Sequence, residues 1–143
     1  MPPTVSAKAA LTVTGLSTLP SDTYCVSDAI DTTVNHPDDV LIEVNITPGT
    51  VSSNKQAVVF FKTSLDGTNY QSGPESGTDD TDEVNLTRIG VIPLASSAVP
   101  ESLTFSLYAA LGFLPPYAKT VIKNDSGADF TAGTINVSEV LYS

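Results

Sequence analysis

The stretch V-L-I-E-V-N-I-T at residues 40–47 decides the fold, because its side chains alternate strictly in character. All four even-numbered positions are Val or Ile, and three of the four odd-numbered positions are polar. Successive side chains of a β-strand point to opposite faces, so this period of two predicts a strand with one buried face. Pro48 and Gly49 follow immediately and end the strand.

Similar runs lie on both sides of this strand, each rich in β-branched or aromatic residues and bounded by turn-forming residues. We expect strands at 24–26, 30–34, 56–64, 84–93, 103–111, 117–123 and 134–142, and a further short one at 9–13. The composition of the second half of 103–111 also suits a helix, so a helix over 103–113 is the alternative there. About eight short strands joined by turns predict an all-β, single-domain antiparallel β-sandwich, jelly-roll-like in its arrangement.

The domain division follows from where apolar runs and charges lie. Residues 1–22 contain few charges and much Thr, Ser and Pro, so we expect an extended N-terminal arm or an edge strand. An arm that lies on a neighbouring subunit is one alternative, and an edge strand or a poorly ordered terminus is the other. Residues 23–143 form the β-sandwich domain. The N-terminus has no secretory signal pattern, and no apolar run approaches the roughly 20 residues of a membrane span.

The charge of the chain excludes two classes of partner. Sixteen acidic and six basic side chains give a formal net charge of −10. A nucleic-acid binder needs clustered Lys and Arg to replace the counterions of phosphates, and an anionic membrane repels an acidic protein. We therefore expect neither partner. The acidity indicates either a protein kept soluble at high local density or a solvated face with no specific partner.

Few residues suit catalysis. His36 is the only histidine, and it precedes a proline in a turn-forming sequence, where we expect an exposed structural role. Cys25 has no basic neighbour in sequence that would lower its pKa, and we expect it to be a small core residue. No glycine-rich loop has the lysine that phosphate binding requires. The sequence predicts that the chain is not an enzyme, with no catalytic, cofactor-binding or metal-ligating residues.

Two groups of residues are candidate ligand sites, and each has a structural role as its alternative. The acidic run D-D-T-D-E at 79–83 lies in a polar stretch, 71–83, that we expect to be an exposed loop. Calcium binding by these carboxylates is the alternative to a solvated acidic loop, but the spacing does not match a helix–loop–helix calcium loop. Tyr70, Tyr108 and Tyr117 are candidate stacking surfaces for a sugar, with packing as the alternative role.

Four segments in fixed order give the chain a resemblance to a known group of proteins. They are T-S-L-D-G-T-N-Y at 63–70, R-I-G-V-I at 88–92, S-L-Y-A-A-L-G-F-L-P-P-Y at 106–117 and K-N-D-S-G at 123–127. In this order they resemble small structural proteins of tailed bacteriophages, of the decoration (cement) or tail-associated kinds. The resemblance covers the C-terminal two-thirds of the chain and does not include the first fifty residues.

The resemblance implies a structural virion protein, most simply a capsid decoration protein that binds and stabilises the assembled head. Its expected partners are the major capsid protein or another virion protein, and further copies of itself, with a trimer as one form. Its expected location is the virion, assembled in the cytoplasm of the bacterial host. A tail- or fibre-associated virion protein and a β-sandwich carbohydrate-binding module are the alternatives.

Overall fold

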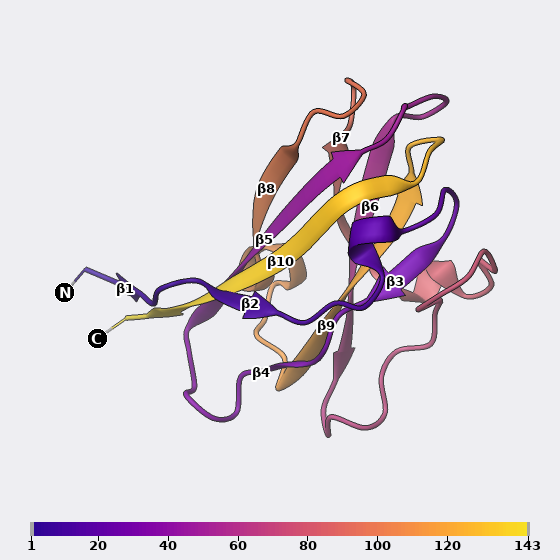
Figure 1. The fold of residues 1–143 in the computed structure, drawn as a ribbon. Coiled ribbons are helices and arrows are strands. Elements are labelled where there is room, and N and C mark those ends of the chain that lie inside the picture. Colours follow the sequence, from indigo (N-terminus) through magenta and orange to yellow (C-terminus); the bar gives the residue numbers. More distant parts are fainter. Residues whose placement is uncertain (1, 143) are drawn as a thin grey trace.

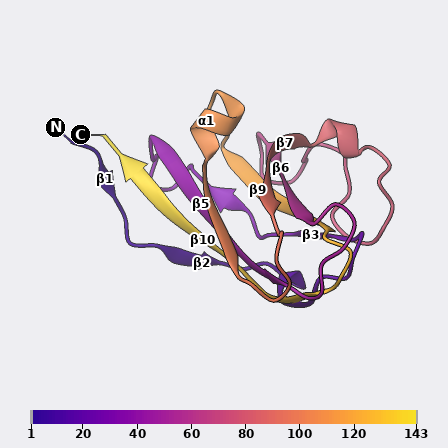
Figure 2. The ribbon, with the colours of Figure 1, turned by 90° about the horizontal axis from the view of Figure 1, so that it is seen from above.

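Two antiparallel β-sheets pack face to face in the computed structural model, which describes residues 2–142 (Figure 1). The first sheet contains β1 (Thr4–Val5), β2 (Ala9–Leu11), β5 (Asp39–Pro48), β8 (Glu101–Ser106) and β10 (Phe130–Leu141). The second contains β3 (Tyr24–Val26), β4 (Ile30–Asp31), β6 (Gln56–Ser64), β7 (Thr87–Pro93) and β9 (Tyr117–Asp125). Figure 2 shows the two layers from above. The expected all-β antiparallel sandwich is confirmed.

Each sheet has two central strands and two edges. The order in the first sheet is β1–β10–β5–β8, with β2 also pairing with β10. The order in the second sheet is β3–β9–β6–β7, with β4 also pairing with β9. The edges are therefore formed by β1 with β2, by β8, by β3 with β4, and by β7.

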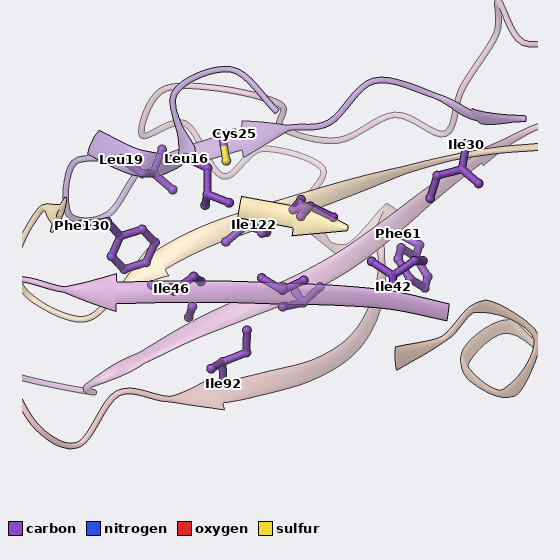
Figure 3. Packing of buried hydrophobic residues seen from close by; sticks show 14 of the residues in the cluster. Leu16, Leu19, Cys25, Ile30, Ile42, Ile46, Phe61, Ile92, Ile122 and Phe130 are labelled. Carbon is purple, nitrogen blue, oxygen red and sulfur yellow. The ribbon is translucent and has the colours of Figure 1, made fainter. Parts of the chain in front are cut away.

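The alternation in β5 places one of its faces in the core, as the sequence predicts. Val40, Ile42, Val44 and Ile46 are 2% exposed or less, whereas the residues between them are half-buried. Figure 3 shows Ile42 and Ile46 facing buried side chains of the second sheet. Removing this apolar surface from water is the main favourable term that holds the two sheets together, at about 25 cal/mol per Å².

The N-terminal segment is part of the same sandwich. β1 and β2 pair with β10 of the same chain, which corresponds to the edge-strand alternative. The segment then enters the core: Leu16, in the short 3₁₀ helix η1 (Leu16–Thr18), is fully buried, and Leu19 is 4% exposed. Only β1 and the end of β10 project from the body, beside the two termini (Figure 1). Met1 lies outside the described residues, and a contact with a neighbouring subunit stays a prediction.

The strand expected at 103–111 is wrong beyond Ser106. Residues Leu107–Leu111 form a short helix, α1, which matches the helical alternative for that part. The Ser106 hydroxyl accepts a hydrogen bond from the Ala109 amide at 3.0 Å, which caps the first turn. Gly112 ends the helix with a φ of 79°, a conformation that glycine adopts without steric cost. The Ser106 and Gly112 caps therefore favour a helix over 107–111, although the apolar alternation of β8 continues into these residues.

Two further strands are shorter than expected. The strand expected at 84–93 begins at Thr87, after a 3₁₀ helix η2 (Glu83–Asn85), and it is irregular at Gly90. An added Cβ at Gly90 would lie 2.7 Å from the Phe105 ring, so a larger residue there requires the ring to move. The strand expected at 30–34 ends at Asp31, whose carboxylate accepts a hydrogen bond from the Thr33 amide at 2.8 Å. Among residues 2–142, no helix has the length and apolar character needed to cross a membrane.

Candidate interaction surface

The two residues considered for nucleophilic chemistry lie on separate elements. Cys25 lies on β3 and is 5% exposed, and burial raises the pKa of its thiol to about 12. The group is therefore a protonated thiol near neutral pH rather than a nucleophilic thiolate. His36 is exposed on the loop between β4 and β5 and makes no side-chain hydrogen bond with residues 2–142. The structure does not bring these two side chains into a reactive pair.

Two of the four carboxylates in the acidic run at 79–83 have partners within the chain. Asp79 accepts hydrogen bonds from the amide and hydroxyl of Thr81, and these bonds lower its pKa. Glu83 accepts a hydrogen bond from the Tyr24 hydroxyl at 2.8 Å and lies 3.6 Å from the Lys123 ammonium. Within residues 2–142, no group of three or more His, Cys, Asp or Glu side chains is placed to hold a metal ion.

The loop expected to be exposed at 71–83 is exposed at Ser72 and throughout 76–82, and its other residues are half-buried or buried. Both of its ends are anchored on the outer face of the second sheet. Pro74 is buried, and Leu86, just after η2, packs with Val58 and Phe60 of β6. The acidic part of the loop is exposed as expected, and the anchoring of its ends depends on an apolar patch that the local sequence does not reveal.

A buried lysine fixes one end of this loop. The Lys62 side chain is 4% exposed, and its ammonium donates to the Gly73 carbonyl at 3.2 Å and to Glu75 at 3.0 Å. A lysine is rarely so buried unless its charge is paired. The loop therefore covers part of the outer face of the second sheet, and grooves beside it still reach β3 and β6.

The outer face of the first sheet has no such cover and is polar. Its side chains are identified by the pairing of β5 with β8 and β10, because paired residues share a face and the opposite face is the core. Apart from Asp39 at the start of β5, they are Leu41, Glu43, Asn45, Thr47, Ser102, Thr104, Ser106, Ala132, Thr134, Asn136 and Ser138. We call this set, together with Lys8 and Ala10 at its edge, the neutral face.

The neutral face has no net charge. Glu43 is its only carboxylate, and the Lys8 ammonium donates to it at 3.2 Å. Asp39 lies on the same side of β5 at the margin of this face, where its carboxylate accepts hydrogen bonds from the Ser106 hydroxyl and the Tyr108 amide. The side-chain amides of Asn45 and Asn136 donate to the same Glu43 oxygen at 3.0 and 3.1 Å. These hydrogen bonds lower the pKa of Glu43, and the bond from Asn45 has the largest effect. One lysine and one glutamate cancel, so the rest of the surface bears the whole formal charge of −10. A negatively charged partner meets least repulsion on this face.

The tyrosines proposed as sugar platforms are only partly brought together. Tyr70 and Tyr117 both pair with Ser64 at the end of β6, whereas Tyr108 is 53% exposed on α1. Tyr70 lines a groove of about 950 Å³ beside β3, but the Lys119 ammonium lies 4.4 Å from its ring centroid. Tyr117 packs against Gly67, where an added Cβ would lie 3.2 Å from its ring. Lys119 thus occupies one face of the Tyr70 ring.

The neutral face was not recognised from the sequence, although a signal for it is present. Ser, Thr and Asn alternate with apolar residues in S-L-T-F-S at 102–106 and in T-I-N-V-S at 134–138. Only the strand pairing shows that these polar positions share one surface with Lys8 and Glu43. No family model matches the chain, and no curated protein matches it.

Proposed function

We propose that the chain is a structural virion protein of a tailed bacteriophage, a decoration protein that binds and stabilises the assembled head. The observation on which this proposal rests is the neutral face, an uncovered sheet surface without net charge on a chain of net charge −10. Such a face lets an acidic protein dock on a surface, and beside its own copies, while the charged remainder stays in water.

The resemblance to phage structural proteins supports the same proposal through the elements that it covers. Residues 63–70 and 106–117 meet at one end of the sandwich, where Ser64 pairs with Tyr117 and the Gly67 backbone packs on the Tyr117 ring. These segments therefore build the scaffold and not a reactive site. A scaffold without a catalytic set suits a protein that acts by binding, so we propose that the chain is not an enzyme.

The proposed mechanism is mechanical. Copies bound across neighbouring capsid subunits add contact area that must be broken before the shell can open, and a specific contact of this kind buries about 1,600 Å². The proposed partner is the major capsid protein or another virion protein, and the proposed location is the virion, assembled in the host bacterial cytoplasm.

Reconstitution on shells that lack the protein tests this proposal. Thr134→Glu places a new charge on the neutral face, whereas Thr78→Glu places the same charge on the exposed part of the acidic loop. We expect wild type and Thr78→Glu to cosediment with purified shells and Thr134→Glu to bind at least tenfold more weakly. Equal binding by the two variants, or absence of wild-type binding, would overturn the proposal.

The groove beside β3 keeps a carbohydrate-binding module as a second candidate. It combines the Tyr70 ring with polar side chains such as Glu75 and Asp28, a mixture found in sugar sites. Lys119 over the Tyr70 ring weighs against stacking. Glycan-array binding that Tyr70→Ala abolishes, with Tyr108→Ala as the control on α1, would favour this candidate over the virion protein.

A further inference from the structure

β8 is a free sheet edge that is regular over its whole length. Its six residues pair with β5 without a register shift, from Ser106 opposite Leu41 to Glu101 opposite Ile46. Its other side pairs with no strand among residues 2–142, and Figure 1 shows it at the border of the first sheet. An unpaired edge presents a row of backbone donors and acceptors that another strand can use.

The opposing edge of the second sheet, β7, is protected against such pairing. Its register shifts where Val59 pairs with Gly90 and Phe60 with Arg88. Pro93 ends the strand and has no amide hydrogen to donate. An irregularity, a charged side chain and a proline are three of the devices by which sheet proteins avoid edge-to-edge association.

The two remaining edges are protected by their shortness and by neighbouring segments. β1 and β2 contain two and three residues, and the chain between them includes Lys8. β3 contains three residues, and backbone bridges close both of its ends: Tyr24 pairs with Gly77, and Ser27 pairs with Val13. Of the edge strands formed by residues 2–142, only β8 is longer than three residues and also lacks a Lys, an Arg, a proline, a bulge or a covering segment.

We propose that β8 pairs with β8 of a second copy of this chain, antiparallel, across a two-fold axis near Leu103 and Thr104. The strand is self-complementary in this arrangement. A register centred on Thr104 places Ser102 opposite the second copy's Ser106, so outward polar residues meet outward polar residues. Leu103, which is 39% exposed, then gains an apolar neighbour at the edge of the core.

Charge supports a second copy as the occupant of this edge. Glu101 is the only charged residue of β8 and lies at its start, so an antiparallel partner places the two Glu101 side chains at opposite ends of the pair. Two chains of net charge −10 repel each other over most of their surfaces. They can approach here because β8 borders the neutral face, which would continue without net charge across both copies.

The contact is small, because it consists of one strand pair. Interfaces below about 1,200 Å² are weak in solution, so we expect a concentration-dependent dimer rather than a permanent one. This inference concerns the isolated chain and does not depend on the proposed virion function. If the chain does not bind shells, the β8 dimer is still expected. If the β8 dimer does not form, shell binding is still expected.

Sedimentation equilibrium of the full chain, from the micromolar to the millimolar range, tests the contact. Thr104→Lys puts a charge on the edge strand, and Thr134→Lys puts the same charge on the same face but on the central strand β10. We expect wild type and Thr134→Lys to form dimers, and Thr104→Lys to dimerise at least tenfold more weakly. A wild-type monomer or trimer, or equal dimerisation of the two variants, would overturn the proposal.

Disulfide trapping provides an independent readout. Directly opposed residues of antiparallel strands have Cα atoms about 4.5–5.5 Å apart, within the range that a disulfide spans. If the two-fold axis passes through Thr104, the two Thr104 positions face each other, and Thr104→Cys alone traps the dimer. If the axis passes through Leu103, Ser102 faces Thr104 of the second copy, and a mixture of Ser102→Cys and Thr104→Cys traps the dimer. The native Cys25 is buried and does not compete. Cross-linking of a Thr134→Cys control instead would indicate face-to-face stacking and would overturn the edge pairing.

Discussion

Replacing Asn124 with aspartate removes two hydrogen bonds that join three segments in the core. Asn124, on β9, is fully buried. Its amide nitrogen donates to the carbonyl oxygens of Leu19 and Ala128, each at 2.8 Å. Its amide oxygen accepts from the backbone amide and the hydroxyl of Ser126, at 3.0 and 2.6 Å. Aspartate retains the two acceptor bonds but loses both donor bonds.

The expected loss of stability follows from the two lost hydrogen bonds. The carbonyl oxygens of Leu19 and Ala128 each keep a second donor, the Phe130 amide and the Ser126 hydroxyl, both at 3.0 Å. Each lost bond therefore costs about 0.5–1.5 kcal/mol, and the pair costs about 2 kcal/mol. For a chain of this size, 1 kcal/mol shifts the melting temperature by about 2–4 °C, which gives a fall of about 4–8 °C. At neutral pH the new carboxylate also faces two carbonyl oxygens, which adds to the loss.

The loss should depend on pH with a defined sign. Burial and the facing carbonyl oxygens raise the folded-state pKa of the introduced carboxyl above its unfolded value of about 3.9. The protonated group is neutral and can donate one hydrogen bond. The variant is therefore closest to wild type below the unfolded pKa, and it loses stability progressively as the pH rises through the folded-state pKa.

Urea unfolding followed by circular dichroism from acidic to neutral pH measures both effects. Asn85→Asp makes the same chemical change at an exposed position without a side-chain hydrogen bond, and it serves as the control. We expect the Asn124→Asp midpoint to fall well below that of the control at neutral pH and to approach it in acid. Coincident midpoints at neutral pH would refute the structural role of Asn124.

Three further predictions concern the N-terminus, the cysteine and a turn. Deleting residues 2–22 should unfold the chain, because losing Leu16 and Leu19 costs about 4–10 kcal/mol against a typical total of about 5–15, whereas deleting residues 2–8 should leave a cooperative melt. Cys25 should react with a thiol reagent at pH 8 only at the rate of unfolding, whereas fast native-state labelling would contradict its burial and raised pKa. Hydrogen bonds from Asn69 and Thr68 hold the pKa of Asp66 well below its usual range, so the stability that Asp66 contributes is present above the unfolded pKa of about 3.9 and is lost as the pH falls through the folded-state value. Asp66→Asn should therefore lose less stability on acidification than wild type, and identical pH profiles would contradict this role.

The parts of the fold that depend on local pattern could be predicted from the sequence. The alternation at 40–47 identified β5 and its buried face, and turn residues located most of the other strands. For residues 107–111 the sequence favours a strand over the helix α1, because the alternation of the preceding strand continues into L-Y-A-A-L. The Ser106 cap and Gly112 were visible in the sequence, and weighing them would have favoured the helix.

The parts that depend on distant segments could not be predicted. The loop at 71–86 covers part of the second sheet because Lys62 reaches Glu75 and because Leu86 finds an apolar patch, and neither contact has a local signal. The neutral face requires Lys8 and Glu43 to meet across the sheet, 35 residues apart in the chain. Edge strands likewise become recognisable only when the strand order is known.

The proposed function is tested most directly by cryo-electron microscopy of the virions that the proposal predicts to carry the chain. We predict a regular array of copies on the head, with the neutral face of β5, β8 and β10 against the shell and the acidic loop at 76–82 toward solvent. A few copies confined to the tail, a head array bound through another face, or absence from the particle would contradict this prediction.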